Sequence, residues 1–305
     1  MIDQDQDRTK FIGGSDIACI MGLSRWGTPL SVWALKTKAI EDPFEMNEAV
    51  EMGIDLEDFV AKKFEQRSGK KVKVDNRDFT HPEYPYMKAH IDRWVIGGEI
   101  LECKTASAYK SGEWDDDIPE EYQLQVNWYL GIVGHASGYI AVLIGGQKFV
   151  WKPIEFNQEL FDIQVERAKD FWENFVLTKV PPMAMTNDKD TLTELFPDSR
   201  PDTMKALRGE DPELEMTFNE LALERVEGKS QIKEIDFVVD EAENKIRQLI
   251  GEGEGIESGQ YKATWKNQNN TKIDITKLRD DGLYEKYAVT KKIRVLRVVE
   301  KKARK

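Results

Sequence analysis

The sequence predicts an α/β (α+β) protein in which helices and short strands are mixed up to residue 180, followed by a long helix and a small β unit. Three observations predict this class. Several segments carry apolar residues at helical spacing, two Gly-Gly pairs separate runs of strand-forming residues, and Pro181-Pro182 closes the mixed part. The predicted order is three helices, a strand, a hairpin, a helix, a second hairpin and a final helix.

The three predicted N-terminal helices are followed by strands. Two short helices lie within residues 11–40, on either side of a turn at 23–29, and Ser15 is a suitable N-cap for the first of them. The third helix covers residues 47–69, where apolar residues form a stripe and Gly69 ends the helix. The later elements are a strand at 70–74, a hairpin of 87–95 and 100–107, a helix at 120–134, a hairpin at 136–156 and a helix at 157–179.

The chain is predicted to divide into three parts. Residues 1–180 form the first domain, residues 181–212 are rich in Pro, Asp and Thr and form a linker, and residues 213–305 form a C-terminal appendage. The appendage begins with a long amphipathic helix at 213–250, in which Gly228 is a candidate position for a break. A flexible turn and a small β unit follow, with strands at 261–275 and 293–301.

The composition excludes several classes of protein. With 33% charged residues and a mean hydropathy of −0.57, the chain has no apolar run long enough for a membrane span, and its N-terminus lacks the apolar segment of a secretory signal. Two cysteines exclude a disulfide framework, a zinc ribbon and a four-cysteine iron–sulfur cluster, and they suit a reducing cytosol. Since there are only three histidines, any metal ligands are expected to be mostly oxygen atoms.

The net charge of −12 by itself argues weakly against a nucleic-acid-binding protein. Its distribution matters more than its sum. Residues 286–305 hold nine Lys or Arg residues and one Glu. Carboxylates gathered in a metal site would also lower the net charge without repelling DNA once the metal is bound.

Two acidic residues and a lysine meet in the first predicted hairpin. Asp92 lies in its first strand, and Glu102 and Lys104 project from one face of its second strand while Cys103 points to the other face. The tight turn brings Asp92 near Glu102. Carboxylates bind Mg²⁺ or Mn²⁺, the metal activates water, and the lysine positions or deprotonates that water. The trio therefore predicts metal-assisted phosphodiester hydrolysis.

The Glu-x-Lys triplet alone is weak evidence, because it starts at Glu102, Glu227, Glu243 and Glu300. Only the first has an upstream hairpin aspartate and apolar strand neighbours. The structural alternative for the trio is a cross-strand ladder of ion pairs on an exposed sheet face.

Two helical residues are further candidates for this site. Gln125 shares an otherwise apolar helix face with Tyr122 and Trp128, so its amide must find a partner. Glu57 lies on the third predicted helix, where the alternative is an exposed helix face.

A phosphate-binding group is predicted at the N-terminus. Arg8, Ser15 and Arg25 surround a Gly-Gly-Ser-Asp turn, and two arginines beside a helix N-terminus suit a phosphate. The alternative is scattered surface arginines. His90 lies two residues before Asp92, on the same face of the predicted strand, and is a candidate to support the metal ligands or to touch the scissile phosphate. The alternative is a packed or hydrogen-bonded strand histidine.

Five separated blocks carry a family resemblance. They are IGGSDIACIMGLSRWGTPLSVW, GIDLEDFVAKKFEQRSG, HPEYPYMKAHIDRW, ILECKTAS and IPEEYQLQVNWYLGIVG, and they fall in order within about residues 8–180. Together they resemble the YqaJ-type viral recombinase family, which is similar to phage lambda exonuclease and belongs to the PD-(D/E)XK nuclease superfamily. The resemblance implies a restriction-endonuclease-like core with a mixed central β-sheet flanked by helices. In place of the Pro-Asp of the superfamily name, this chain has Ile91-Asp92.

The resemblance also implies roles for the metal-site candidates. Asp92 and Glu102 match the metal-binding carboxylates, and the backbone carbonyl of Cys103 is a further ligand. Lys104 matches the catalytic lysine. Glu57 matches the helix glutamate that helps to bind metal or water.

Other roles implied by the resemblance lie outside the hairpin. Gln125 matches the glutamine of a Tyr-x-x-Gln motif that begins at Tyr122. Ser15 matches the serine of the N-terminal motif, and Arg8 and Arg25 fall at spacings suited to a pocket for a 5′-terminal phosphate.

The implied activity is stepwise 5′-to-3′ digestion of one strand of linear duplex DNA, which leaves 3′ overhangs for phage-type recombination by strand annealing. The implied cofactor is Mg²⁺, as two ions, with Mn²⁺ as a substitute. The implied partners are duplex DNA ends, a single-strand annealing recombinase and further copies of the chain in a ring, with a trimer favoured. No membrane partner is expected, and a phage or prophage protein would work in the cytosol of its bacterial host.

Two other functions stay open. One is an endonuclease or a RecB-like helicase-associated nuclease, although the chain has no helicase P-loop. The other is a silent adaptor that binds DNA ends, against which the intact Asp92, Glu102 and Lys104 argue. For the C-terminal region the alternatives are a packing or oligomerisation appendage and a DNA-holding or partner-docking module, the latter suggested by the basic tail.

Overall fold

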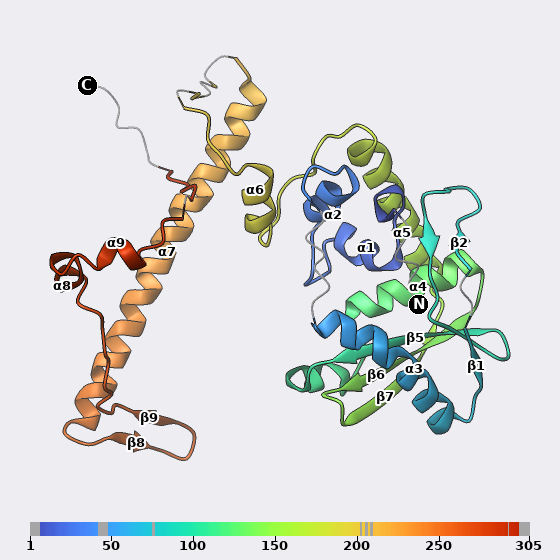
Figure 1. Ribbon diagram of the computed structural model, residues 1–305, viewed down its shortest axis with the longest axis horizontal. Helices are drawn as coiled ribbons and strands as arrows, with labels where there is room; N and C mark the ends of the chain where they lie inside the picture. Colours follow the sequence, from blue (N-terminus) through green and yellow to red (C-terminus); the bar gives the residue numbers. More distant parts are fainter. Residues whose placement is uncertain are drawn as a thin grey trace. The chain divides into compact units, whose positions relative to one another are not determined.

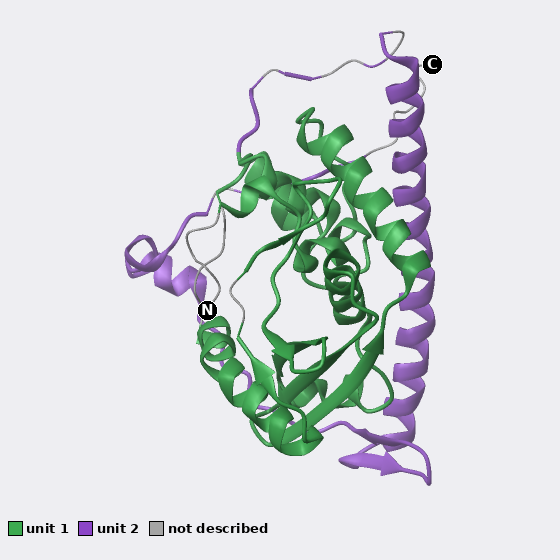
Figure 2. Ribbon diagram, turned by 90° about the vertical axis from the view of Figure 1, so that its right-hand side faces the viewer, with its two compact units in different colours: residues 1–197 green, residues 198–305 purple. Residues whose placement is uncertain are grey.

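The computed structural model describes residues 7–41, 48–74, 77–201, 203–204, 207, 210–291 and 293–298. The chain forms two compact units, residues 1–197 and 198–305 (Figures 1 and 2). Residues 181–197, predicted as the start of a linker, therefore belong to the first unit. The reason is a buried polar contact that the composition does not reveal: Asp188 is fully buried and accepts hydrogen bonds from the Thr28 hydroxyl and from the Met185 amide.

The first unit is built on a five-stranded sheet of order β1-β4-β5-β6-β7. The strands are β1 (Val72–Lys73), β4 (Arg93–Val95), β5 (Glu99–Ala106), β6 (Ser137–Ile144) and β7 (Lys148–Glu155). β5 and β6 are parallel and the other neighbouring pairs are antiparallel. The parallel pair needs a crossover, which a 3₁₀ helix (Ala108–Trp114) and α4 (Glu120–Val133) provide. The mixed sheet flanked by helices confirms the predicted fold class.

Both predicted Gly-Gly turns are present, but the first hairpin is shorter than predicted. Gly97 and Gly98 adopt φ values of 131° and 105°, which side chains with a Cβ rarely adopt. Residues 87–95 do not form one strand: they divide into β3 (Lys88–Ala89), which pairs with β2 (Phe79–Thr80), and β4. Asp92 therefore lies in the connection between two sheets, directly before β4, and not within a strand.

Different helices cover the two faces of the sheet (Figure 1). Leu101 of β5 joins Val60 and Phe64 of α3 (Glu48–Ser68) in one hydrophobic cluster. Its neighbour Ile100 joins Leu124 of α4 in another. Because successive strand residues point to opposite faces, α3 and α4 lie on opposite sides of the sheet.

The first of two N-terminal helices packs against α4, and the second packs against the first. They are α1 (Gly14–Ile20) and α2 (Pro29–Lys36), and a 3₁₀ turn at Arg8–Lys10 precedes them. A Cβ at Gly14 would lie 2.4 Å from the Tyr129 ring, so a glycine is required where α1 meets α4.

The last elements of the first unit close its helical layer. α5 (Gln158–Phe171) continues into a π-helical segment (Trp172–Val176), and α6 (Lys189–Leu195) follows. Trp172 stacks on Tyr86, with ring centroids 4.9 Å apart. The predicted helix at 157–179 is thus confirmed, and it ends before Pro181-Pro182.

The second unit consists of a long helix and short elements. These are α7 (Pro212–Ile250), a hairpin of β8 (Gly255–Glu257) and β9 (Lys262–Thr264), α8 (Ile275–Asp280) and α9 (Tyr284–Tyr287). α7 runs through Gly228 without the break considered there. Residues 293–298 do not form the strand that was predicted at 293–301. Instead, β9 pairs with β8, which lies in the segment predicted to be a flexible turn after the long helix. Among the described residues beyond Asp188 none is buried.

In the part of the chain that the structure describes, no helix is long and apolar enough to cross a membrane.

Candidate active site

Glu102 and Lys104 lie side by side on the α4 face of β5. Lys104 Nζ is 2.5 Å from Glu102 Oε1, and Glu102 is only 3% exposed. Gln125 of α4 donates from Nε2 to the same carboxylate oxygen over 2.8 Å. Cys103 packs with the α3 cluster on the other face, as strand alternation predicts. The buried Glu102 carboxylate is therefore held by one cation and one amide.

Gln125 is itself held from two sides. Its Nε2 also donates to Tyr129 Oη over 2.9 Å. A Cβ at Gly14 would lie 2.9 Å from Gln125 Cγ, so α1 packs closely against this side chain. The prediction that the Gln125 amide needs a partner on an otherwise apolar helix face is confirmed, and the partner is Glu102.

Asp92 approaches β5 from the connection before β4. Its Oδ2 accepts a hydrogen bond from the Cys103 amide over 2.7 Å. Burial, and then the nearby Glu102 carboxylate, raise the pKa of Asp92 to about 7, although Lys104 and the Cys103 amide act in the opposite direction. The carboxylates of Asp92 and Glu102 therefore form a region of concentrated negative charge.

Lys104 keeps its proton in this environment. Burial lowers the pKa of Lys104, but the carboxylates of Glu102 and Asp92 outweigh that effect and raise it. The Tyr122 ring lies beside Lys104, with its centroid 5.5 Å from Lys104 Nζ. The same ring stacks on Trp114. The geometry thus favours a cationic, positioning lysine over a lysine that acts as a base.

Arg93 joins the site to α3. Its buried guanidinium pairs with Glu57, lies 2.5 Å from Asp58 Oδ1 and donates to the backbone oxygen of Asp92 over 2.6 Å. Burial, and then the Asp92 carboxylate, raise the pKa of Glu57, while Arg93 lowers it. Glu57 thus approaches Asp92 from α3, as the sequence predicts, but it is engaged with an arginine that the sequence analysis did not select.

The donor set suits a hard divalent cation. Asp92 and Glu102 offer carboxylate oxygens that repel each other, and a cation bound by both would relieve that repulsion. Glu57 and the Cys103 carbonyl are further oxygen donors nearby. In the described ranges, however, no three His, Cys, Asp or Glu side chains are grouped closely enough to hold a metal ion as they stand. Glu57 faces Arg93 and Glu102 faces Lys104, so a metal would have to compete with these cations.

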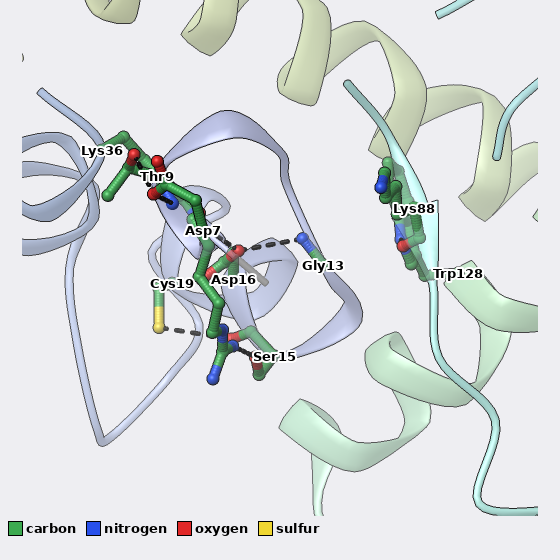
Figure 3. Close-up of polar contacts among 10 residues, drawn as sticks. Asp7, Thr9, Gly13, Ser15, Asp16, Cys19, Lys36, Lys88 and Trp128 are labelled. Atoms are coloured by element: carbon green, nitrogen blue, oxygen red, sulfur yellow. Dashed lines mark hydrogen bonds and ion pairs between the residues drawn. The ribbon is translucent and has the colours of Figure 1, made fainter. Parts of the chain in front are cut away.

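Arg8 and Ser15 come together at the start of α1, with Nη2 donating to Ser15 Oγ over 2.8 Å. Ser15 is not the N-cap that the sequence predicts; Gly13 is. The reason is Asp16, whose Oδ2 accepts from the Gly13 amide over 2.9 Å and pairs with Lys36 Nζ over 2.7 Å (Figure 3). A carboxylate of the chain itself therefore already caps this helix.

Arg25 has acidic partners. Its Nη1 lies 2.7 Å from Glu113 Oε2 and its Nε lies 2.7 Å from Glu121 Oε1. The first of these carboxylates is partly exposed and the second is nearly buried. The structure thus joins Arg8 to Ser15 and joins Arg25 to two carboxylates.

His90 pairs with an aspartate outside the candidate site. Its Nδ1 lies 2.9 Å from Asp78 Oδ1, and its ring lies 5.5 Å from that of Phe11. Because residues 90–92 connect two sheets, strand alternation does not apply to His90 and Asp92. The hydrogen-bonded alternative given above for His90 describes its position.

The sequence prediction did not include three residues of the site, although the sequence contains a signal for each of them. Arg93 is a charged residue in an apolar strand, which is unusual unless it is paired. Tyr129 lies four residues after Gln125, on the same helix face. Gly14 belongs to the Gly-Gly-Ser-Asp turn but was not considered as a packing residue.

Comparisons with known proteins find one sequence family and several related structures. The family model described as YqaJ-like viral recombinase domain matches residues 5–136. The chain is 39% identical over 289 residues to the uncharacterized protein YqaJ of Bacillus subtilis (strain 168), a match that covers 92% of this chain and 88% of the relative.

Similar solved structures include an alkaline exonuclease, LHK-Exo, from Laribacter hongkongensis, with a TM-score of 0.46 and 15% identity over 57% of this chain and 91% of that one. The same protein in complex with dAMP has a TM-score of 0.47 and 16% identity over the same shares of the two chains. A phage-related exonuclease from Haemophilus somnus 129PT has a TM-score of 0.43 and 14% identity, over 55% of this chain and 96% of that one.

Proposed function

The chain belongs to the YqaJ-like viral recombinase family, and from this premise we propose that it is a metal-dependent nuclease that digests one strand of linear duplex DNA from its 5′ end. The observation that carries the proposal is the convergence of Asp92, Glu102 and Lys104 at β5. Two acidic groups beside a protonated lysine suit a polyanionic substrate only if a cation is bound by the acids.

Each side chain has a separate task in this proposal. Mg²⁺, as two ions, or Mn²⁺ in its place would be held by Asp92 and Glu102, with Glu57 and the Cys103 carbonyl as further donors, and would supply Lewis acidity for phosphodiester hydrolysis. Lys104 orients the attacking water or a phosphate oxygen through its ammonium group. Gln125 fixes the orientation of Glu102, because its amide donates to that carboxylate.

The proposed 5′ polarity rests on the N-terminal residues. Arg8 and Ser15 together offer a guanidinium and a hydroxyl to a terminal phosphate, and their 2.8 Å contact supports a shared role. Arg25 joins this group in the proposal only by exchanging the carboxylates of Glu113 and Glu121 for the phosphate.

The wider biological role follows from the family. Digestion from the 5′ end would leave 3′ overhangs, which a single-strand annealing recombinase would use in phage-type recombination. A ring of several copies, with a trimer favoured, would keep the enzyme on its DNA. Work in the cytosol of a bacterial host is part of the same proposal.

The test is digestion of linear duplex DNA with or without 5′-phosphates, in Mg²⁺ or in EDTA, by the full chain and two variants. Lys104→Ala should abolish digestion. Lys148→Ala is the matched control, because Lys148 also lies on a strand of the sheet with its Nζ 2.5 Å from a carboxylate, that of Asp115, but in an exposed pair. The control should digest DNA at the normal rate.

The expected result is metal-dependent loss of the 5′-phosphorylated strand by the unaltered chain and the control. Cleavage of closed circles would favour the endonuclease or RecB-like alternative. Binding to DNA ends without digestion would favour the silent adaptor. Equal activity of Lys104→Ala and Lys148→Ala would remove the lysine from the proposed site.

A further inference from the structure

The long helix α7 carries a sequence pattern that the nuclease proposal does not use. Positions spaced alternately by four and three residues extend along the helix from Leu214 to Leu249. They are Leu214, Phe218, Leu221, Arg225, Gly228, Ile232, Ile235, Val239, Ala242, Ile246 and Leu249. Nine of the eleven are apolar, and their mean period is the 3.5 residues of a coiled-coil seam.

This seam is uncovered in the single chain. No residue of the 39-residue helix is buried, and Ile232, Ile235 and Leu249 are 50%, 61% and 72% exposed. A helix with a long apolar stripe gains most of its stability by packing that stripe against another element. The stripe therefore requires an occupant.

We propose that the occupant is α7 of a second copy, and that the two helices form an antiparallel coiled coil centred between Ile232 and Ile235. In this register Ile232 packs beside the second copy's Ile235, and Phe218 packs beside the second copy's Leu249. Leu221 then packs beside the second copy's Ile246, so the apolar positions from Phe218 to Leu249 have apolar neighbours apart from the layers of Arg225 and Gly228, whereas Leu214 lies beyond the end of the second copy's α7.

The two interruptions are matched in the same register. Arg225 lies opposite Ala242, the smallest apolar residue of the seam, which leaves room for the long side chain. Gly228 lies opposite the branched Val239. A large residue thus meets a small one at both layers, as close packing of a helix pair requires.

The charges beside the seam select the antiparallel orientation. Glu224 faces Lys245 of the second copy, and Lys229 faces Asp236 of the second copy; symmetry repeats each pair. In a parallel pair Glu224 would meet Lys229, and Lys245 would lie beside the apolar Ile250. Lys245 now pairs with Glu241 of its own helix, but that pair is exposed and contributes little.

The proposed contact differs from the contact of a ring. An antiparallel helix pair is two-fold symmetric, so it cannot be the contact that repeats around a three-membered ring. If the chain also forms trimeric rings, α7 would join two rings into an assembly of six copies. In either case the number of copies is even.

The test compares two substitutions of similarly exposed apolar residues in the full chain. Ile235→Glu places a charge in the seam, whereas Phe237→Glu places it on the opposite side of α7, where Phe237 is 70% exposed. Sedimentation equilibrium should show an even-numbered assembly for the unaltered chain and for Phe237→Glu. Ile235→Glu should halve the mass, with a loss of affinity of at least roughly a hundredfold.

Charge reversal tests the orientation without disturbing the apolar seam. Glu224→Lys should weaken the assembly by roughly tenfold, because two attractive pairs become repulsive. Adding Lys245→Glu should restore the affinity in an antiparallel pair, whereas adding Lys229→Glu should not.

Four outcomes would overturn the proposal. The unaltered chain could be monomeric or contain an odd number of copies, or the assembly could survive Ile235→Glu. The two glutamate variants could dissociate the assembly equally. Finally, Lys229→Glu could restore the affinity of Glu224→Lys while Lys245→Glu does not. A monomeric chain that binds an annealing protein through α7 would assign the seam to that partner instead.

Discussion

The candidate active site and α7 depart from the usual placement of side chains in opposite directions. In the first unit Arg93 and Glu102 are 5% and 3% exposed, although both are charged. In the second unit Ile235 and Phe237 are 61% and 70% exposed, although both are apolar. The buried charges have partners within the chain, whereas no apolar residue of α7 is buried. The buried charges are thus organised by the single chain, and the exposed apolar residues of α7 fit the association proposed above.

This difference has a measurable consequence. Substitutions in the site should change stability or catalysis at any protein concentration, because their partners belong to the same chain. Substitutions in the seam of α7 should have effects that depend on protein concentration, because the proposed partner is a second copy.

The largest effect on stability is expected from Arg93→Met. It would leave the half-buried Glu57 carboxylate beside Asp92 without the buried Arg93 cation, which costs about 3 kcal/mol of the free energy of unfolding. Arg247→Met is the matched control, since Arg247 forms an exposed pair with Glu243 on α7 and its loss should cost about 1 kcal/mol or less. Urea unfolding measures both variants, and equal losses would contradict the contrast between the two regions.

The next effect concerns pH. Because folding raises the pKa of Asp92 from 3.8 to about 7, the folded metal-free chain holds this proton more tightly than the unfolded chain. The stability that this proton provides is complete below the unfolded pKa and is lost as the pH rises towards 7. At pH 8, Asp92→Asn should therefore raise the free energy of unfolding by about 1 to 3 kcal/mol.

Urea unfolding in EDTA between pH 4 and 8 tests this pH dependence. Asp240→Asn, on the exposed surface of α7, serves as the control and should change stability by less than about 0.5 kcal/mol. If Asp92→Asn is less stable than the unaltered chain at pH 8, the negative charge of Asp92 is already balanced by cations and hydrogen-bond donors of the same chain.

The last pair of effects concerns two glycines, and the smaller of them is expected at Gly228. Gly14→Ala would place a Cβ 2.4 Å from the Tyr129 ring and should cost about 1 to 3 kcal/mol, with lower nuclease activity because Gln125 would move too. A Cβ at Gly228 meets nothing within 4 Å in the single chain, so Gly228→Ala should stabilise α7 by about 0.5 to 1 kcal/mol at a protein concentration low enough to separate the proposed pair. Thermal unfolding followed by circular dichroism tests both, and the same sign for the two variants would contradict this account.

Local patterns in the sequence predicted much of the fold. The turns at Gly97-Gly98 and Gly145-Gly146 and the faces of Glu102 and Lys104 depend on neighbouring residues alone, and the structure has them as predicted. The long helix and the family are confirmed as well. The roles assigned to the candidate site residues, their metal and their DNA remain predictions.

Features that depend on distant residues were predicted less well. Asp92 was expected within a strand, but the chain turns from one sheet to another there. Residues 181–197 look like a linker, yet the buried contact of Asp188 with Thr28 attaches them to the first unit. Arg25 was expected beside a phosphate, and the structure gives it Glu113 and Glu121, which are remote in sequence.

The sequence by itself determined the alternation of β5, the positions of the turns and the apolar stripe of α7, because these follow from backbone geometry and residue periodicity over a few residues. Only the tertiary structure decided which charges are compensated. Arg93 with Glu57, Gln125 with Glu102 and Arg25 with its two glutamates each join separate elements. Such pairs form only when packing brings the elements together, since the energy of a charge depends on its burial and on its neighbours in space.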